Sequence, residues 1–260
     1  MTTPTVVANL AETTRVVVIT GASAGIGAAL AEALSARGDA TVLVARRADV
    51  LRDVAARCGP LAHPIVADVT QRDEVKRVVT ESLARFGRVD VWVNNVGQGI
   101  SRMPSQLTDE DIDDTMRVNV KSALYGMQEI LPHFKERGTG QIVNVSSMLG
   151  RVPMAVFRSA YVGAKHFLNG LTATFRAEVQ QTHPDIQVTL VSPGVVRTEF
   201  GLNAMHGGPD SRTLPNSQSA EETALAIVEA IENRAPDMYT FKGAQGTIAG
   251  YYAGLGVDPS

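Results

Sequence analysis

Residues 15–38 read RVVVITGASAGIGAALAEALSARG, and this stretch decides the fold. The unbroken apolar run at residues 16–19 is typical of a strand buried on both faces of a parallel sheet. Between residues 26 and 34 the apolar side chains recur every three or four positions, which predicts an amphipathic helix that Gly38 ends. A buried strand followed directly by such a helix indicates the first unit of an α/β fold.

The same alternation continues along the chain. Further strands are predicted at residues 41–45, 65–67, 89–93, 142–145 and 186–191. Helices are predicted around 50–55, 70–86, 111–135 and 161–180 and from 219 onward, with capping boxes at 70–73, 108–111 and 219–222. We therefore expect an α/β fold, a single doubly wound Rossmann-type parallel sheet with helices on both faces. One domain would span residues 15–260 after an N-terminal extension of residues 1–14, with a substrate lid at about 200–219.

Composition narrows the class of protein. Of the 260 residues 44% are hydrophobic and 20% charged, which is ordinary for a globular chain and argues against disorder. The formal net charge is −3, so we expect no nucleic-acid partner. A single cysteine, Cys58, can form neither an internal disulfide nor a metal cluster, and no apolar run has the length of a membrane span. These features favour a cytoplasmic protein without a metal or a membrane partner.

The loop TGASAGIG at residues 20–27 joins the first strand to the first helix. Glycines there let the backbone approach a pyrophosphate, and the helix N-terminus offers unpaired N–H groups. The spacing is Gly-x-x-x-Gly-x-Gly, and a glycine turn without a ligand is the alternative interpretation. The residues expected to bind a dinucleotide cofactor here are Gly21, Ser23, Gly25, Ile26 and Gly27.

Tyr161 and Lys165 are four residues apart on a predicted helix, so their side chains share a face. An adjacent ammonium in a partly desolvated cleft favours the phenolate, which would move the tyrosine pKa toward neutrality and give a general acid/base. Alone, such a pair is more typical of neighbours on a helix surface. Polar residues also follow two predicted strands: Ser146 and Ser147 follow 142–145, and Asn95 lies just beyond 89–93. Strand-end caps and turns are the alternatives there.

Taken together, these residues resemble the short-chain dehydrogenase/reductase family, in its short single-domain branch. The match runs from about Arg15 to about Asn233. The motifs that carry it are the loop at 20–27, Asp68-Val69, Asn-Asn-x-Gly at 94–97, Asn119, Ser147, Tyr161-x-x-x-Lys165, and Pro193-Gly194 with Thr198. This chain departs from the family pattern at Val96, where alanine is usual, and in the interval of 14 residues from Ser147 to Tyr161, which is one longer than expected and predicts a reshaped loop.

The resemblance implies roles for individual residues. Tyr161 would donate the proton to a carbonyl, Ser147 would hydrogen-bond that oxygen, and Lys165 would lower the Tyr161 pKa and hold the nicotinamide ribose. Asn119 would continue a water-linked proton relay from Lys165. The remaining implied cofactor contacts are Asp68 and Val69 to the adenine, Asn95 to the ribose on the adenosine side, and Pro193, Val196 and Thr198 to the nicotinamide carboxamide.

Cofactor choice is indicated by Arg46 and Arg47 at the end of the second strand, where an arginine accommodates a 2′-phosphate. A solvated basic pair is the alternative. We therefore expect NADP (as NADPH), rather than NAD, in an oxidoreductase that interconverts a ketone or aldehyde and an alcohol. A non-catalytic dinucleotide-binding regulator of the same fold is the alternative function. A hydrolase using Ser147 is disfavoured, because the local sequence Asn-Val-Ser-Ser-Met lacks a Gly-x-Ser-x-Gly elbow.

The substrate pocket is expected to be mainly apolar. The side chains predicted to line it are Met148, Met154, Phe157, Leu202 and Met205, with core packing as the alternative for each. The resemblance also implies a homodimer or homotetramer, in which the helices at 111–135 and 161–180 pair across a two-fold axis.

Overall fold

The computed structural model describes residues 10–11 and 14–256, so most of the expected N-terminal extension lies outside the described residues. Seven parallel strands form one sheet in the order β3-β2-β1-β4-β5-β6-β7. The strands are β1 (Val16–Thr20), β2 (Ala40–Ala45), β3 (Ala62–Val66), β4 (Val91–Asn94), β5 (Gly140–Val145), β6 (Ile186–Ser192) and β7 (Asp237–Tyr239). The order reverses direction at β1 and β4, which is the topological switch point where open α/β sheets bind ligands.

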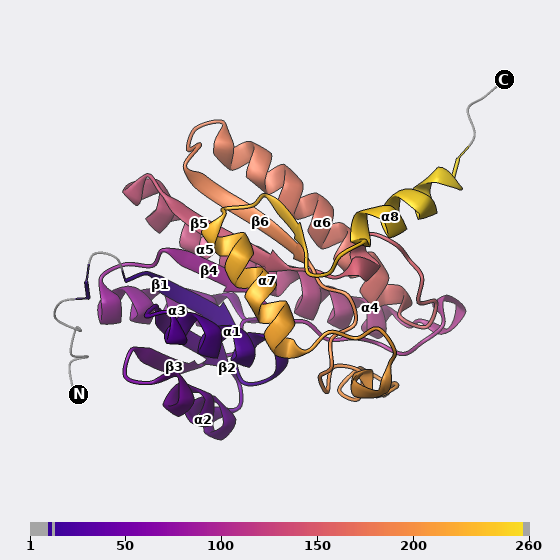
Figure 1. Ribbon diagram of the computed structural model, residues 1–260, viewed down its shortest axis with the longest axis horizontal. Coiled ribbons are helices and arrows are strands. Elements are labelled where there is room, and N and C mark those ends of the chain that lie inside the picture. Colours follow the sequence, from indigo (N-terminus) through magenta and orange to yellow (C-terminus); the bar gives the residue numbers. More distant parts are fainter. Residues whose placement is uncertain (1–9, 12–13, 257–260) are drawn as a thin grey trace.

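Helices cover both faces of this sheet (Figure 1). The α-helices are α1 (Gly25–Ala36), α2 (Ala48–Cys58), α3 (Arg72–Phe86), α4 (Asp109–Met116), α5 (Ser122–Arg137), α6 (Ser159–Gln180), α7 (Ala220–Glu232) and α8 (Ala244–Ala253). Val16 and Val18 of β1 face a core formed with α3, α5 and α6, whereas Val17 and Ile19 face a core formed with α1, α2 and α7. The alternation of side chains along each strand thus confirms the predicted doubly wound sheet with two helical layers.

Two predicted elements differ from the structure. No side chain caps α3: its N-cap is Gln71, and the Thr70 hydroxyl instead donates to Asp68 Oδ1 at 2.8 Å, so the predicted capping box at 70–73 is wrong. The predicted helix at 111–135 is divided into α4 and α5 by a π-helical turn, η2 (Arg117–Lys121). The other two capping boxes are confirmed, Thr108 with Asp111 and Ser219 with Glu222.

The segment at 200–219 is irregular except for a short 3-10 turn, η4 (Ser211–Thr213), and it lies beside α4 at one side of the molecule (Figure 1). His206 Nε2 lies 2.6 Å from Asp111 Oδ1 of α4, and Met205 bridges to Ile100. After β7 the chain forms α8, which projects from the body (Figure 1). Among the described helices, none combines the length and apolarity needed to cross a membrane.

Candidate functional site

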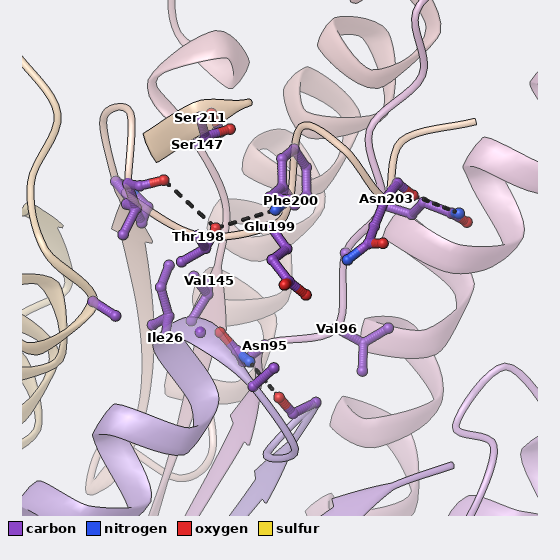
Figure 2. Close-up of a pocket in the computed structure, with 18 of the residues that line it drawn as sticks. Ile26, Asn95, Val96, Val145, Ser147, Thr198, Glu199, Phe200, Asn203 and Ser211 are labelled. Atoms are coloured by element: carbon purple, nitrogen blue, oxygen red, sulfur yellow. Dashed lines mark hydrogen bonds between the residues drawn. The ribbon is translucent and has the colours of Figure 1, made fainter. Parts of the chain in front are cut away.

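A cleft of about 1830 Å³ opens at the carboxyl ends of β1, β2, β4, β5 and β6. Residues from both of its sides appear in Figure 2, with Ile26 and Asn95 on the sheet side and Thr198 and Phe200 on the segment after β6. Most predicted site residues line this cleft: Gly21, Ser23, Gly25, Ile26, Arg46, Arg47, Asp68, Val69, Asn95, Ser147, Tyr161, Lys165, Pro193, Val196 and Thr198. Gly27 and Asn119 do not line the cleft. Gly27 lets α1 approach the carbonyl of Gly21, and Asn119 hydrogen-bonds the main chain of Gln98.

The glycine loop places bare backbone at the start of α1. A Cβ at Gly27 would lie 2.3 Å from the Gly21 carbonyl oxygen, so only glycine fits there. Gly25 has a φ of +56°, a conformation that L side chains rarely adopt. The N-cap, Ala24, offers no side-chain hydrogen bond, and the first turn of α1 holds no acidic residue. The first N–H groups of α1 therefore lack a side-chain partner, and this arrangement suits a phosphate group.

Asn95 fixes the turn next to this loop. Its side-chain amide donates to the Thr20 carbonyl at 3.1 Å, and its backbone N–H donates to the Thr20 hydroxyl at 3.0 Å. The Thr20 hydroxyl in turn donates to the Val93 carbonyl at 3.1 Å. The ends of β1 and β4 are thereby held together, which keeps the floor of the cleft in one geometry.

Arg46 and Arg47 follow β2 and are both exposed on the wall of the cleft. Arg47 Nη2 donates to the Ser23 hydroxyl at 3.2 Å, so this arginine reaches the glycine loop. The carboxylate of Asp68, which follows β3, accepts from the backbone N–H of Thr70 at 3.0 Å. Two cations and a serine hydroxyl therefore gather beside the N-terminus of α1, where an additional phosphate group could be bound.

Tyr161 lies in the first turn of α6 and is 6% exposed. Ser147, at the end of β5, accepts from the Leu149 N–H at 3.1 Å, and its side chain lies near enough to Tyr161 to lower the pKa of that phenol. Ser146 turns elsewhere and donates to Asn169 Oδ1 at 2.5 Å. The ring of Phe200 packs edge-on against Tyr161 with a centroid separation of 5.5 Å. A serine hydroxyl and a tyrosine phenol thus converge at one point of the cleft despite the longer interval between them.

Lys165 lies one turn further along α6 and is 2% exposed. Its Nζ donates to the Val145 carbonyl at 3.1 Å and lies 5.6 Å from the centre of the Tyr161 ring. Asn119, in the π-helical turn, clamps the main chain of Gln98: its Oδ1 accepts from the N–H and its Nδ2 donates to the carbonyl, each at 3.0 Å. Gly97 lies close to the side chains of both Asn119 and Lys165: a Cβ there would lie 3.2 Å from Asn119 Oδ1 and 3.5 Å from Lys165 Nζ.

Burial shifts both titratable groups. It raises the pKa of Tyr161 to about 12, against a smaller lowering by the Ser147 hydrogen bond and by the charge of Arg158. Burial also lowers the pKa of Lys165 to about 8. The expectation of a Tyr161 pKa near neutrality is therefore wrong for this structure, because the loss of hydration outweighs the neighbouring charges. The phenol is therefore held protonated at neutral pH.

The walls near Tyr161 agree only in part with the predicted apolar set. Met148, Met154 and Phe157 line the cleft, whereas Leu202 and Met205 do not. Leu202 is 46% exposed on the surface, and Met205 pairs with the main chain of Ile100 and Ser101, so for these two the prediction is wrong. Sequence reasoning also missed two lining residues, Phe200 and Arg158. The spacing of Arg158, three residues before Tyr161, could have revealed that they share a helix face.

Comparisons with known proteins agree with this geometry. The family model described as short chain dehydrogenase matches residues 15–206. The curated protein "Uncharacterized oxidoreductase YxnA" of Bacillus subtilis is 31% identical over 232 residues, which cover 86% of this chain and 65% of that protein. The chain therefore spans slightly less than two thirds of the length of that relative.

Solved structures are similar along nearly the whole chain. A short-chain dehydrogenase from Sphingobium yanoikuyae in complex with NADPH is 28% identical with a TM-score of 0.77, covering 95% of this chain and 98% of that one. A short chain dehydrogenase/reductase from Burkholderia phymatum in complex with NAD is 22% identical with a TM-score of 0.84, again covering 95% and 98%, and at that identity it speaks for the fold alone.

Proposed function

The chain belongs to the short chain dehydrogenase family of oxidoreductases, and from this premise we propose that it is an NADP-dependent carbonyl reductase with Tyr161 as its general acid/base. The observation that carries the proposal is the meeting of the Ser147 side chain, the Tyr161 phenol and the Lys165 ammonium in one cleft. The same cleft continues to the glycine loop at the start of α1. A non-catalytic regulator would need the glycine loop but not this group of side chains.

The cleft fits a dinucleotide by its own chemistry. The bare backbone of Gly21, Gly25 and Gly27 suits the pyrophosphate, and a side chain at Gly27 would collide with Gly21. The other residues proposed to hold the cofactor are Ser23, Ile26, Arg46, Arg47, Asp68, Val69, Asn95, Tyr161, Lys165, Pro193, Val196 and Thr198. When bound, a nicotinamide dinucleotide supplies the hydride for reduction or accepts it in oxidation.

The residues of this chain manage the proton and the position of the carbonyl. In reduction, Tyr161 Oη donates its proton to the carbonyl oxygen, and its raised pKa keeps that proton in place at neutral pH. The Ser147 hydroxyl donates a hydrogen bond to the same oxygen. Lys165 stabilises the phenolate left behind and offers hydrogen bonds to the ribose, while Asn119 holds the loop at Gly97 and Gln98 beside it and continues the proposed water-linked proton relay.

NADP is preferred in this proposal because two cations gather where a 2′-phosphate would lie. Arg46 and Arg47 are exposed on the cleft wall, and Arg47 is aligned by the Ser23 hydroxyl. The NADPH complex of the Sphingobium protein adds support. An NAD-specific enzyme of this architecture would place a carboxylate after β2 instead.

The proposed substrate is a small carbonyl compound with a mainly apolar body, since Met148, Met154, Phe157 and Phe200 line the Tyr161 end of the cleft. Residues 200–219 would close over it as a lid within a single domain of residues 15–260. We further propose a cytoplasmic location, and a homodimer or homotetramer.

The decisive experiment compares Tyr161→Phe with the unmodified enzyme. The change keeps the ring and removes the transferable proton, so NADPH binding should persist while turnover falls by roughly 10²–10⁴-fold. NADPH binding by fluorescence and single-turnover reduction by absorbance measure the two quantities separately. Lys165→Ala should weaken both. Tight NADPH binding with near-normal hydride transfer in Tyr161→Phe would refute the assignment and favour the non-catalytic regulator.

A further inference from the structure

Arg158 is a buried cation at the Tyr161 end of the cleft. It is 7% exposed, immediately precedes α6 as its N-cap residue, and lines the cleft. Tyr161 is the titratable side chain whose charge acts on it. Neither the proposed proton transfer nor the proposed cofactor binding uses this arginine.

The guanidinium has no acidic partner among residues 10–11 and 14–256, where an ion pair would bring a carboxylate oxygen within 4.0 Å. Within the same residues, its one hydrogen bond runs from Nη1 to the Ile100 carbonyl at 3.3 Å, and its Cζ lies 5.1 Å from the centre of the Phe157 ring. Burial lowers the pKa of Arg158 without bringing it near neutrality, because a guanidinium stays protonated in proteins. Buried charges in proteins are normally paired, so we expect an anion to bind to the Arg158 guanidinium.

The loops around Arg158 hold it in one position. The Arg102 N–H donates to the Phe157 carbonyl at 2.8 Å, and the Ser159 hydroxyl donates to the Arg102 carbonyl at 2.9 Å. On the side of the 200–219 segment, a Cβ at Gly208 would lie 3.0 Å from Arg158 Nη2 and 2.8 Å from the Ser101 hydroxyl. The nearest atom to that position is the Gly201 carbonyl oxygen, at 2.7 Å, and neither Ser101 nor Gly208 lines the cleft, so the main chain of the 200–219 segment holds the guanidinium on this side.

The Ser101 hydroxyl is itself unusual. It is buried and has no hydrogen-bond partner within the part of the chain that the structure describes. An unpaired buried hydroxyl costs free energy unless a ligand or water completes it. A buried guanidinium with donors to spare on the wall of the cleft makes a site for an anionic oxygen group without help from this hydroxyl.

We propose that Arg158 binds a carboxylate on the substrate and selects keto acids over neutral ketones. This inference rests on the proposed reductase function and narrows its substrate class. The forked N–H groups of an arginine match the two oxygens of a carboxylate. The apolar rings of Phe157 and Phe200 leave the rest of that substrate in apolar surroundings.

The position of Arg158 also limits the substrate's length. Residues three apart at a helix start place their Cβ atoms about 5–6 Å from each other. A carbonyl at Tyr161 and a carboxylate at Arg158 are therefore a few bonds apart. In the reaction the carbonyl carbon gains the hydride and its oxygen gains the Tyr161 proton, while the carboxylate is unchanged and the product is a hydroxy acid.

The cofactor's own phosphates are not the anion in question. The proposed phosphate-binding residues follow β1 and β2, whereas Arg158 follows β5, and β4 lies between β1 and β5 in the sheet. Arg158 also lies three residues before Tyr161 and lines the same cleft, at the end where the proposed reaction takes place.

The test compares two keto acids, benzoylformate and 3-benzoylpropionate, with their methyl esters, using NADPH and the full chain. The wild type should reduce the better acid with a kcat/KM at least tenfold above that of its ester. Arg158→Gln keeps a donor for the Ile100 carbonyl and loses the charge, so this acid-to-ester ratio should fall by roughly 10–100-fold. Arg158→Lys keeps the charge without the fork and should lie between the two.

Arg57→Gln is the matched control, because Arg57 also lines the cleft but already pairs with Glu32 at 2.7 Å and lies outside the proposed lid. Its ratio should equal that of the wild type. A wild-type ratio at or below one, or an unchanged ratio in Arg158→Gln, would overturn the proposal and leave Arg158 as a tie to Ile100. If Arg158→Gln does not fold, the wild-type ratio decides together with competitive inhibition by benzoate, which should exceed that by benzamide at least tenfold. If NADPH reduces neither acids nor esters, the proposed function itself fails.

Discussion

At the scale of single residues, burial sets the acid-base properties of Tyr161 and Lys165 in opposite senses. Both side chains lie inside the cleft wall, so each favours its neutral form: the pKa of the phenol rises to about 12 and that of the amine falls to about 8. Near pH 8 an appreciable fraction of Lys165 is therefore uncharged. The cost of burying this ammonium must appear in the pH dependence of folding.

We expect Lys165 to make the cofactor-free protein more stable as the pH rises. Its pKa is about 8 in the folded chain and near its ordinary value of 10.5 in the unfolded chain. Between these values the unfolded chain binds more protons, so the free energy of unfolding increases with pH. Relative to Lys165→Met, the wild type should gain roughly 1–2 kcal/mol between pH 7 and pH 9.5, measured by urea unfolding. A difference between the two proteins that does not change with pH would contradict this.

Cofactor choice is the second property set by individual side chains. Arg46→Asp replaces a cation on the cleft wall with a carboxylate that repels a 2′-phosphate and suits ribose hydroxyls. The ratio of kcat/KM with NADPH to that with NADH should fall by roughly 10–100-fold. Arg52→Asp is the control, since Arg52 lies on α2 and pairs with Asp49 there. Equal kcat/KM values of the unmodified enzyme with NADPH and NADH would contradict the proposed preference for NADP.

At the scale of elements, buried apolar runs predicted six of the seven strands, because strands covered on both faces are rich in apolar residues, even though β5 also buries Gln141 and Asn144. β7 was missed, as a three-residue edge strand that is partly exposed has no such pattern. The π-helical turn was missed because it is set by tertiary contacts: the Asn119 side chain bonds the main chain of Gln98, a contact that local periodicity does not contain.

The residues of the candidate site were likewise only partly predictable from the sequence. Residues at strand ends and in the glycine loop could be placed from the sequence, because topology brings strand carboxyl ends to one edge. Phe200 and the exposed Leu202 could not, since they lie in the segment after β6, whose course depends on tertiary contacts.

The segment at 200–219 is tied to α4 by one polar contact that we expect to restrain it. His206 Nε2 lies 2.6 Å from Asp111 Oδ1, and Asp111 also closes the capping box of α4. Replacing His206 with alanine removes the tie and leaves the cap in place. Trypsin cleavage after Arg212, which is exposed in this segment, should become several-fold faster.

His183→Ala is the control for this experiment, because His183 contacts its neighbour Thr182 away from the segment. The rate of cleavage after Arg212 should not change in that variant. If His206→Ala is cleaved no faster than the control, the contact does not restrain the segment, and Met205 pairing with Ile100 and Ser101 would be the remaining tie.

At the scale of the whole molecule, the two ends of the sheet differ in how completely their polar groups are paired. At the amino ends of the strands, the Asp90 carboxylate accepts from the Val16 N–H at 2.7 Å and pairs with Arg88 and Arg137. At the carboxyl ends, α1 begins without a side-chain cap and Arg158 has no carboxylate partner among the described residues. The polar groups at the amino ends of the strands are therefore paired within the protein, whereas those at the carboxyl ends can bind a ligand.

Self-association is the property that involves the outer face of the helical layer. α6 carries the buried Tyr161 and Lys165 on its inner side, and Phe167 on the same helix is 53% exposed. A large aromatic ring left in water on a long helix favours contact with a second copy. We expect the chain to form a dimer or tetramer in which α6 and the α4–α5 region pair across a two-fold axis, so that each copy contributes its Phe167 to the interface.

Phe167→Glu should therefore shift the sedimentation coefficient toward that of the monomer at micromolar concentration, because two carboxylates would be brought together at the axis. Leu225→Glu is the matched control: Leu225 is 57% exposed but lies on α7, which packs on the other face of the sheet, and this variant should sediment like the wild type. A wild type that is already monomeric at this concentration would contradict the assembly, whereas dissociation by Leu225→Glu instead would place the interface on the α7 face. Because α6 carries Tyr161, a loss of the α6 contact should also lower turnover, and activity measured across the concentration range of dissociation links the assembly to the site.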